Sequence, residues 1–163
     1  MLKKNLQGLE GAREAVLRLL ARRDHSAEEL RLKLIRKGFA PADIETVLAG
    51  LTERGLLDDQ GYAIKLARVL AKENHFGPRR IQQRLSAKGI HQDLIQGALD
   101  EAAREAPVRE RLAASLGVKL KGRAVEAISV PEKRRLINYL RQRGFAWGDI
   151  ADAVQERGGF EEE

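Results

Sequence analysis

The stretch that decides the fold is Gly77–Leu99, GPRRIQQRLSAKGIHQDLIQGAL, in the middle of the chain. Ile81 and Leu85 are four residues apart, which is the spacing of one helix face. Gly89 follows them, and glycine is the residue type that most readily takes the left-handed conformation that ends a helix. A second amphipathic segment comes after the glycine. The stretch therefore predicts a basic helix, a glycine stop and a further helix.

The same pattern occurs once before and once after this stretch. Gly38, Gly89 and Gly144 are spaced by 51 and 55 residues, and aligning the chain on them makes apolar positions coincide. The matched apolar sets are Leu30, Ile81 and Leu136; Leu34, Leu85 and Leu140; Phe39, Ile90 and Phe145; and Ile44, Ile95 and Ile150. Such periodicity predicts tandem helical repeats, each stacked on its neighbours to complete a core.

Helical spacing continues along the rest of the chain, and no segment alternates as a strand would. A first helix is expected over residues 12–23, after a loose basic lead-in. The Ser26-x-x-Glu29 pattern predicts a capping box at the start of the next helix. The fold class is therefore expected to be all-α, with three tandem three-helix, helix-turn-helix-like repeats. The expected domains are residues 1–55, 56–106 and 107–163, the last with an acidic tail.

Composition excludes several classes of protein. The chain of 163 residues contains no cysteine, which excludes a disulfide framework and a thiol nucleophile. No apolar run approaches the roughly 18 residues of a membrane span, and the first residues lack the apolar core of a signal peptide. We expect a soluble, cytoplasmic protein.

Positive charge is concentrated on the middle helix of each repeat. These three segments carry 13 basic and 3 acidic side chains, whereas the whole chain has a net charge of +6, so the remainder is net acidic. A solvated helix face is one interpretation, and contact with phosphate or an acidic protein surface is the other. Recurrence in all three repeats favours contact. The candidate binding residues are Arg31, Lys33, Arg36, Lys37, Arg79, Arg80, Arg84, Lys88, Arg134, Arg135, Arg141 and Arg143.

Three of these cations have a second interpretation. Lys37, Lys88 and Arg143 come directly before the glycine stops, where a cation stabilises the negative end of a helix by about 0.3–1 kcal/mol without any ligand. Structural and binding roles therefore both remain open for them.

No catalytic, metal or cofactor site is expected. Asp58 and Asp59 are interpreted as helix caps, because no carboxylate or histidine cluster lies at ligand spacing beside them. The three histidines are scattered, and nothing combines a nucleophile, a base and an orienting group. Phe145 and Trp147 are expected in the core of the last repeat, although an exposed Trp147 could stack on a base.

The ordered set of residues resembles the RecX family of bacterial recombination regulators. The resemblance lies in LARRDHS at residues 20–26, Lys37-Gly38-Phe39, GLLDD at residues 55–59, and Lys88-Gly89-Ile90. It covers about residues 12–156, and the third repeat is more divergent, resting mainly on Arg143-Gly144-Phe145 and Ile150.

The resemblance implies a curved, elongated stack of three repeats that acts without catalysis. It implies binding to the RecA recombinase filament on DNA, with inhibition of its ATPase, coprotease and strand-exchange activities. It also implies direct DNA binding, without cofactors. Completion of one repeat's core by the next would favour a monomer.

The alternative is a non-specific or helix-turn-helix DNA-binding protein that does not regulate RecA. A sequence-specific reader would expose Asn, Gln or Arg on its recognition helix. The helices after the glycines are instead acidic, which makes them poor groove readers; they carry Asp43, Glu45, Asp100, Glu101, Asp149 and Asp152.

Overall fold

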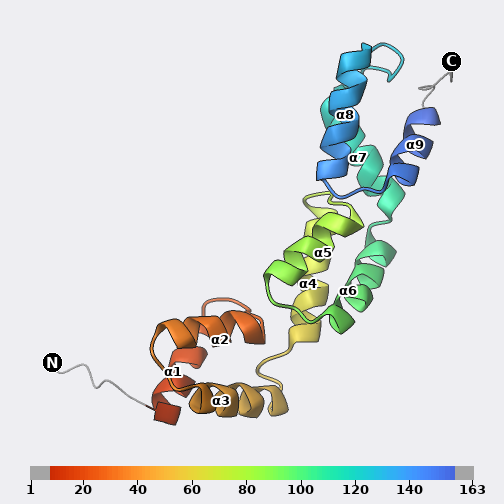
Figure 1. The fold of residues 1–163 in the computed structure, drawn as a ribbon. Helices are drawn as coiled ribbons and strands as arrows, with labels where there is room; N and C mark the ends of the chain where they lie inside the picture. Colours follow the sequence, from red (N-terminus) through yellow and green to blue (C-terminus); the bar gives the residue numbers. More distant parts are fainter. Residues whose placement is uncertain (1–7, 157–163) are drawn as a thin grey trace.

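The computed structural model of the chain describes residues 8–156, and in this range it consists of nine helices joined by short loops (Figure 1). The first repeat contains α1 (Gly8–Leu20), α2 (Ala27–Arg36) and α3 (Pro41–Glu53). The second contains α4 (Asp59–Lys72), α5 (Pro78–Ala87) and α6 (Gln92–Glu105). The third contains α7 (Val108–Leu120), α8 (Val130–Gln142) and α9 (Trp147–Gln155). The all-α prediction is confirmed.

The first helix begins four residues and ends three residues earlier than predicted. It begins at Gly8 and ends at Leu20, because packing of Gly11 and Ala12 against the first core extends the helix toward its beginning. The rest of the predicted lead-in, residues 1–7, and the acidic tail after residue 156 lie outside the described residues.

Each repeat closes an apolar core of its own. Leu30, Leu34 and Ile44 are fully buried in the first core, which also contains Leu57. The second and third repeats have separate clusters around Ile81 and around Leu140. That neighbouring repeats complete one another's core stays a prediction: the three clusters are distinct, yet Leu57, which follows the predicted boundary after residue 55, packs in the first of them. The boundaries after residues 55 and 106 stay predictions.

The middle helices α2, α5 and α8 end as the repeat pattern predicts. Gly38, Gly89 and Gly144 have φ of +85°, +72° and +90°, the left-handed region that favours glycine. In the first repeat the Phe39 amide donates to the Leu34 carbonyl at 3.2 Å and the Gly38 amide donates to Ile35 at 2.9 Å. This pair of hydrogen bonds is a Schellman motif. It reverses the chain into the third helix of the repeat.

The three repeats form an elongated body. In the view of Figure 1, the second and third repeats follow one another in one direction, while the first repeat lies across their lower end. The described chain enters at the first repeat and leaves at the far end of the third. No helix within residues 8–156 has the length and apolar character needed to cross a bilayer.

Candidate functional site

The three basic helices are joined end to end. The end of α5 contacts the start of α2, where the Ser26 hydroxyl donates to the Lys88 carbonyl. The end of α8 contacts the start of α5, where the Gly77 amide donates to the Arg143 carbonyl at 2.8 Å. Each contact places the amide-rich start of one helix against the carbonyl-rich end of another, which is electrostatically favourable. The basic segments, far apart in sequence, thus become neighbours.

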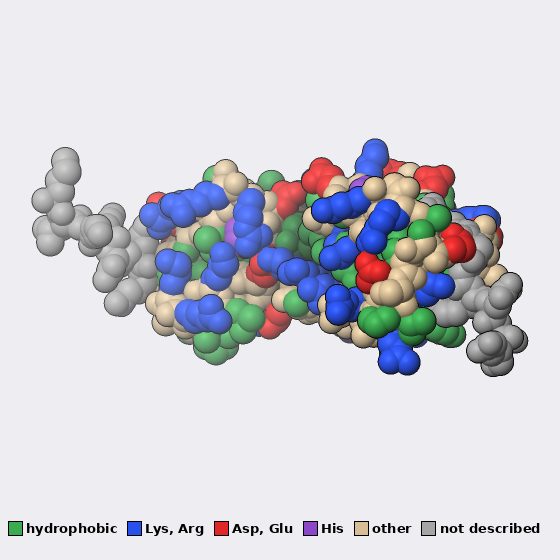
Figure 2. Space-filling model, turned by 90° about the horizontal axis from the view of Figure 1, so that it is seen from above, with side chains coloured by type: hydrophobic (Ala, Val, Ile, Leu, Met, Phe, Trp, Pro, Cys, Tyr) green, Lys and Arg blue, Asp and Glu red, His purple; other side chains and the backbone are tan. Residues whose placement is uncertain are grey.

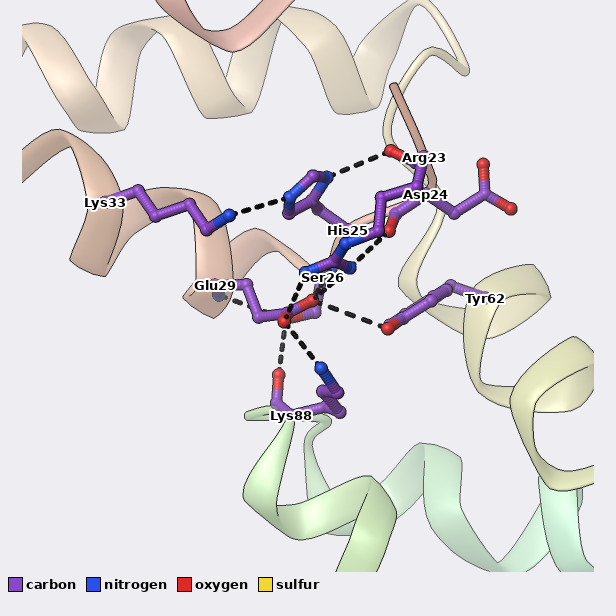
Figure 3. A network of polar contacts seen from close by, with 8 residues as sticks. All are labelled: Arg23, Asp24, His25, Ser26, Glu29, Lys33, Tyr62 and Lys88. Atoms are coloured by element: carbon purple, nitrogen blue, oxygen red, sulfur yellow. Dashed lines mark hydrogen bonds and ion pairs between the residues drawn. The ribbon is translucent and has the colours of Figure 1, made fainter. Parts of the chain in front are cut away.

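Glu29 organises the first junction, between the first and second repeats (Figure 3). Its carboxylate accepts from Lys88 Nζ at 2.9 Å and from Arg23 Nη2 at 3.1 Å, and Tyr62 OH lies 3.4 Å from its second oxygen. Burial by itself would raise the pKa of Glu29, but the hydrogen bonds from Arg23 and Lys88 outweigh it and lower the pKa to about 2. The carboxylate is therefore held charged across the junction.

His25 supports this junction from the loop before α2 (Figure 3). Its Nδ1 lies 2.9 Å from the Arg23 carbonyl and its Nε2 lies 3.0 Å from Lys33 Nζ (Figure 3). Because an ammonium group can only donate, Nε2 accepts and Nδ1 donates. Burial, with the nearby cations Arg23 and Lys33, lowers the pKa of His25. The neutral ring thus fixes the loop that presents Arg23 to Glu29.

The second junction, between the second and third repeats, rests on backbone contact. In addition to the Gly77 bond, the Arg79 amide donates to the Gly144 carbonyl at 3.2 Å. The Arg143 guanidinium lies 4.9 Å from the Phe76 ring centroid and 5.3 Å from that of Tyr139, and it donates to the Asn74 carbonyl. Arg143 is thus fixed between two aromatic rings.

Arg111 adds a buried cation to the second junction. Its side chain, only 3% exposed, reaches from α7 to donate to the carbonyl of Phe76. Burial lowers the pKa of Arg111. The third repeat is therefore tied to the loop before α5 by two arginines, one on α7 and one at the end of α8.

The candidate cations fall into two groups. Four are engaged within the chain: Lys88 and Arg143 at the junctions, Lys33 on His25, and Arg31, whose Nε lies 2.6 Å from Glu45. The hydrogen bond to Glu45 raises the pKa of Arg31 despite partial burial. Seven others are exposed and have no acidic partner within residues 8–156: Arg36, Lys37, Arg79, Arg84, Arg134, Arg135 and Arg141.

Arg80 is intermediate between these groups, since its guanidinium lies 5.9 Å from the Phe76 ring centroid and it has no acidic partner in the described range. Figure 2, a view from above, shows Lys and Arg side chains gathered over the first repeat and again over the other end of the molecule. What this surface can do chemically is to bind a polyanion or an acidic protein face through charge-assisted hydrogen bonds. Within residues 8–156 there is no group of three His, Cys, Asp or Glu able to hold a metal ion.

Several junction residues were missed by reasoning from the sequence. Glu29 was identified only as part of a capping box, which the structure confirms, while its partners Arg23 and Tyr62 were not identified. Their partnership could not be found locally, because Lys88 lies 59 residues from Glu29. The Phe76-Gly77 pair before Pro78 was the one local signal of a tight contact at the second junction.

Two aromatic predictions had different outcomes. Phe145 is 1% exposed in the third core, as predicted, whereas the prediction of a buried Trp147 is wrong, since it is 55% exposed. Trp147 occupies the first position of α9, where side chains point back beyond the start of the helix rather than onto its packed face.

Comparison with known proteins agrees with this architecture. The family description "RecX, first three-helix domain" matches residues 12–51, and "RecX, second three-helix domain" matches residues 58–99. The crystal structure of RecX from Lactobacillus salivarius superposes with a TM-score of 0.80 at 23% identity, covering 92% of this chain and 96% of that one. This likeness shows the fold, including the third repeat that neither matched range contains.

Relatives cover nearly the whole chain. The "Regulatory protein RecX" of Vibrio vulnificus is 35% identical over 144 residues, which is 88% of this chain and 91% of the relative. That of Halorhodospira halophila is 35% identical over 162 residues, covering 93% and 94%. With two matching family descriptions and relatives of this identity along its length, the chain belongs to the RecX family of regulatory proteins.

Proposed function

We propose that this chain binds the RecA–DNA filament and inhibits its ATPase, coprotease and strand-exchange activities, and so modulates DNA repair and recombination. It acts without catalysis, as a cytoplasmic monomer that contacts both RecA and DNA phosphates. Family membership supports a regulatory role, and the elongated shape suits a filamentous partner.

The observation that carries this proposal is the end-to-end arrangement of the three basic helices. Lys88 and Arg143 make contacts within the junctions. Exposed cations remain on all three helices, and these have no acidic partner among the described residues. Unpaired cations on three joined helices form the kind of surface expected to contact a polyanion or a repeating acidic surface.

The test is RecA's ATPase on single-stranded DNA, titrated with the wild type and with Arg79→Glu/Arg84→Glu. Both side chains are exposed on α5, and the junction contact of Arg79 is made by its backbone amide alone, so the variant is expected to fold. We expect inhibition by the wild type, and about tenfold more of the variant for half inhibition, which corresponds to about 1.4 kcal/mol of binding.

A matched control carries the same charge change away from the middle helices. Arg54→Glu/Lys72→Glu reverses two exposed cations on α3's end and α4's last turn, neither with an acidic partner in the described range. It should inhibit like the wild type. The proposal fails if wild-type protein in stoichiometric excess leaves the ATPase unchanged, and the role of α5 fails if both variants lose inhibition equally.

The alternative function, DNA binding without RecA regulation, is weakened at the third helices of the first and second repeats. Glu45 is engaged by Arg31, and Glu101 of α6 is engaged by Arg68 and Arg104, so these helices present neutralised or acidic surfaces. This alternative is tested by measuring binding to several DNA sequences at several salt concentrations. Strong salt dependence without sequence preference means phosphate contact alone.

A further inference from the structure

The outer face of α2 differs from the outer faces of α5 and α8. Leu32 and Ile35 are 45% and 50% exposed, three residues apart on one side of α2. Under the glycine alignment their counterparts are Gln83 and Ser86 in α5, and Asn138 and Arg141 in α8. All four counterparts are exposed and polar. An exposed aliphatic pair is thus a property of the first repeat's middle helix.

The free charge of α2 differs as well. Arg31 is engaged by Glu28 and Glu45, and Lys33 Nζ donates to Nε2 of His25. The remaining cations, Arg36 and Lys37, lie together at the end of the helix, and Arg36 follows Leu32 by four residues on the same side. The aliphatic pair is therefore bordered by positive charge at one end only.

This combination favours a protein partner over a nucleic acid. Leucine and isoleucine offer neither a donor for phosphate nor a flat ring for stacking on a base, and DNA interfaces are polar and strongly basic. An apolar patch with arginine at its edge is the composition of a protein interface, and spacing of i and i+3 suits a helix laid into a groove.

We propose that the Leu32–Ile35 face of the first repeat docks into an apolar groove on the RecA protein itself, with an acidic rim facing Arg36 and Lys37. The unpaired cations of α5 and α8 contact phosphate instead. This division of contacts rests on the proposed function, and it assigns protein recognition and DNA recognition to different repeats.

The test uses two variants of the full chain and two probes. Leu32→Gln/Ile35→Ser gives α2 the residues of α5 at surface positions, and Arg79→Glu/Arg84→Glu removes free charge from α5. Affinity is measured for RecA filaments assembled on single-stranded DNA and for the same DNA alone. We expect the first variant to lose about tenfold in filament affinity with DNA affinity unchanged, and the second to lose at least tenfold in DNA affinity.

Several outcomes would overturn this inference while leaving the proposed function standing. Unchanged filament affinity of Leu32→Gln/Ile35→Ser is one, and an equal loss on bare DNA is another, since it would make the pair a DNA contact. Self-association of the wild type that this variant abolishes in sedimentation velocity would assign the face to a second copy. Absence of any wild-type effect on RecA would instead remove the proposed function and this inference together.

Discussion

The two junctions join the same helix ends by different chemistry. Between the first and second repeats, side chains make the contact: Glu29 collects Lys88, Arg23 and Tyr62. Between the second and third, backbones touch, and a Cβ at Gly77 would lie 2.3 Å from the carbonyl carbon of Gly144. Where the start of α2 has a serine, the start of α5 has this glycine. Gly77 thus lets two backbones touch at the second junction. The first junction combines the ion pairs of Glu29 with a close approach of Gly89 to the side chain of Glu28.

The difference shows how a repeat protein can join the same helix ends by different contacts. A junction of charged side chains responds to pH and salt, whereas backbone hydrogen bonds at closest approach respond mainly to shape. The first joint is also the place where the repeats change direction (Figure 1). We therefore expect conditions that weaken ion pairs to act on the first repeat before they act on the third.

The largest loss of unfolding free energy is expected when a methyl group is added at the second junction. Gly144→Ala would place a Cβ 2.2 Å from the backbone nitrogen of Arg80, at a φ of +90°. Gly38→Ala is the matched control, since Gly38 has a φ of +85° and open space around it. We expect a loss of about 4 kcal/mol or more in the free energy of unfolding for Gly144→Ala and about 1–2 kcal/mol for Gly38→Ala. Urea denaturation measures both, and equal losses would contradict the close contact.

Removing the central carboxylate should produce the next largest effect. Glu29→Ala leaves Lys88 and Arg23 without their partner, and we expect a loss of about 2 kcal/mol in unfolding free energy. Faster amide exchange should follow at the end of α5, with no change at Gly77. Glu45→Ala, which removes an exposed carboxylate of α3 that also pairs with Arg31, is the control and should cost under 1 kcal/mol. An equal loss of unfolding free energy in the two variants would show that Glu29 contributes no more to stability than an exposed carboxylate does.

Acid should loosen the first junction selectively. The folded pKa of Glu29 is about 2 against 4.5, so its contribution is complete above pH 4.5 and is lost as pH falls toward 2. The pKa of His25 is also lowered by burial, so its contribution is present above pH 6.5 and declines below it. Amide exchange followed from pH 7 downward should accelerate around Ser26 before it accelerates around Gly77. The reverse order would contradict the assignment.

The smallest change in unfolding free energy is expected when Arg143 is replaced by lysine or Lys88 by arginine. Arg143→Lys keeps the charge but loses the flat group that stacks between Phe76 and Tyr139, at a cost of about 1 kcal/mol. Lys88→Arg keeps a donor for Glu29 and should change the unfolding free energy by less than 0.5 kcal/mol. Thermal unfolding of the two variants compares them directly, and an equal effect would show that stacking contributes nothing.

Much of the local structure could be predicted, since helix periodicity, caps and stops depend on residues only a few positions apart. The glycine stops and the Ser26 capping box are confirmed on that basis. The Trp147 prediction was wrong because periodicity does not say where a side chain points in the first turn of a helix. Leu57 packs in the first core although it follows the predicted boundary after residue 55, because periodicity identifies an apolar face without identifying what covers it.

The candidate binding residues were likewise only partly predictable from the sequence. The sequence identified twelve cations on three helices, but it could not distinguish Lys88 and Arg143, which hold the junctions, from exposed Arg79 and Arg84. Both junction cations had been given a structural interpretation as helix-end charges. Their actual contacts reach another repeat, so the structural role is larger than the local argument allowed.

By itself, the sequence determined that the chain forms three helical repeats with basic middle helices, because hydrogen bonding within a helix and the left-handed stop depend only on neighbouring residues. Only the tertiary structure decided which cations remain free, how the repeats join and where the chain turns. Those outcomes depend on pairs such as Glu29 with Lys88 and Gly77 with Arg143, which are separated by about sixty residues. Such partners are brought together only by the packing of one repeat on the next, so no short-range pattern encodes them.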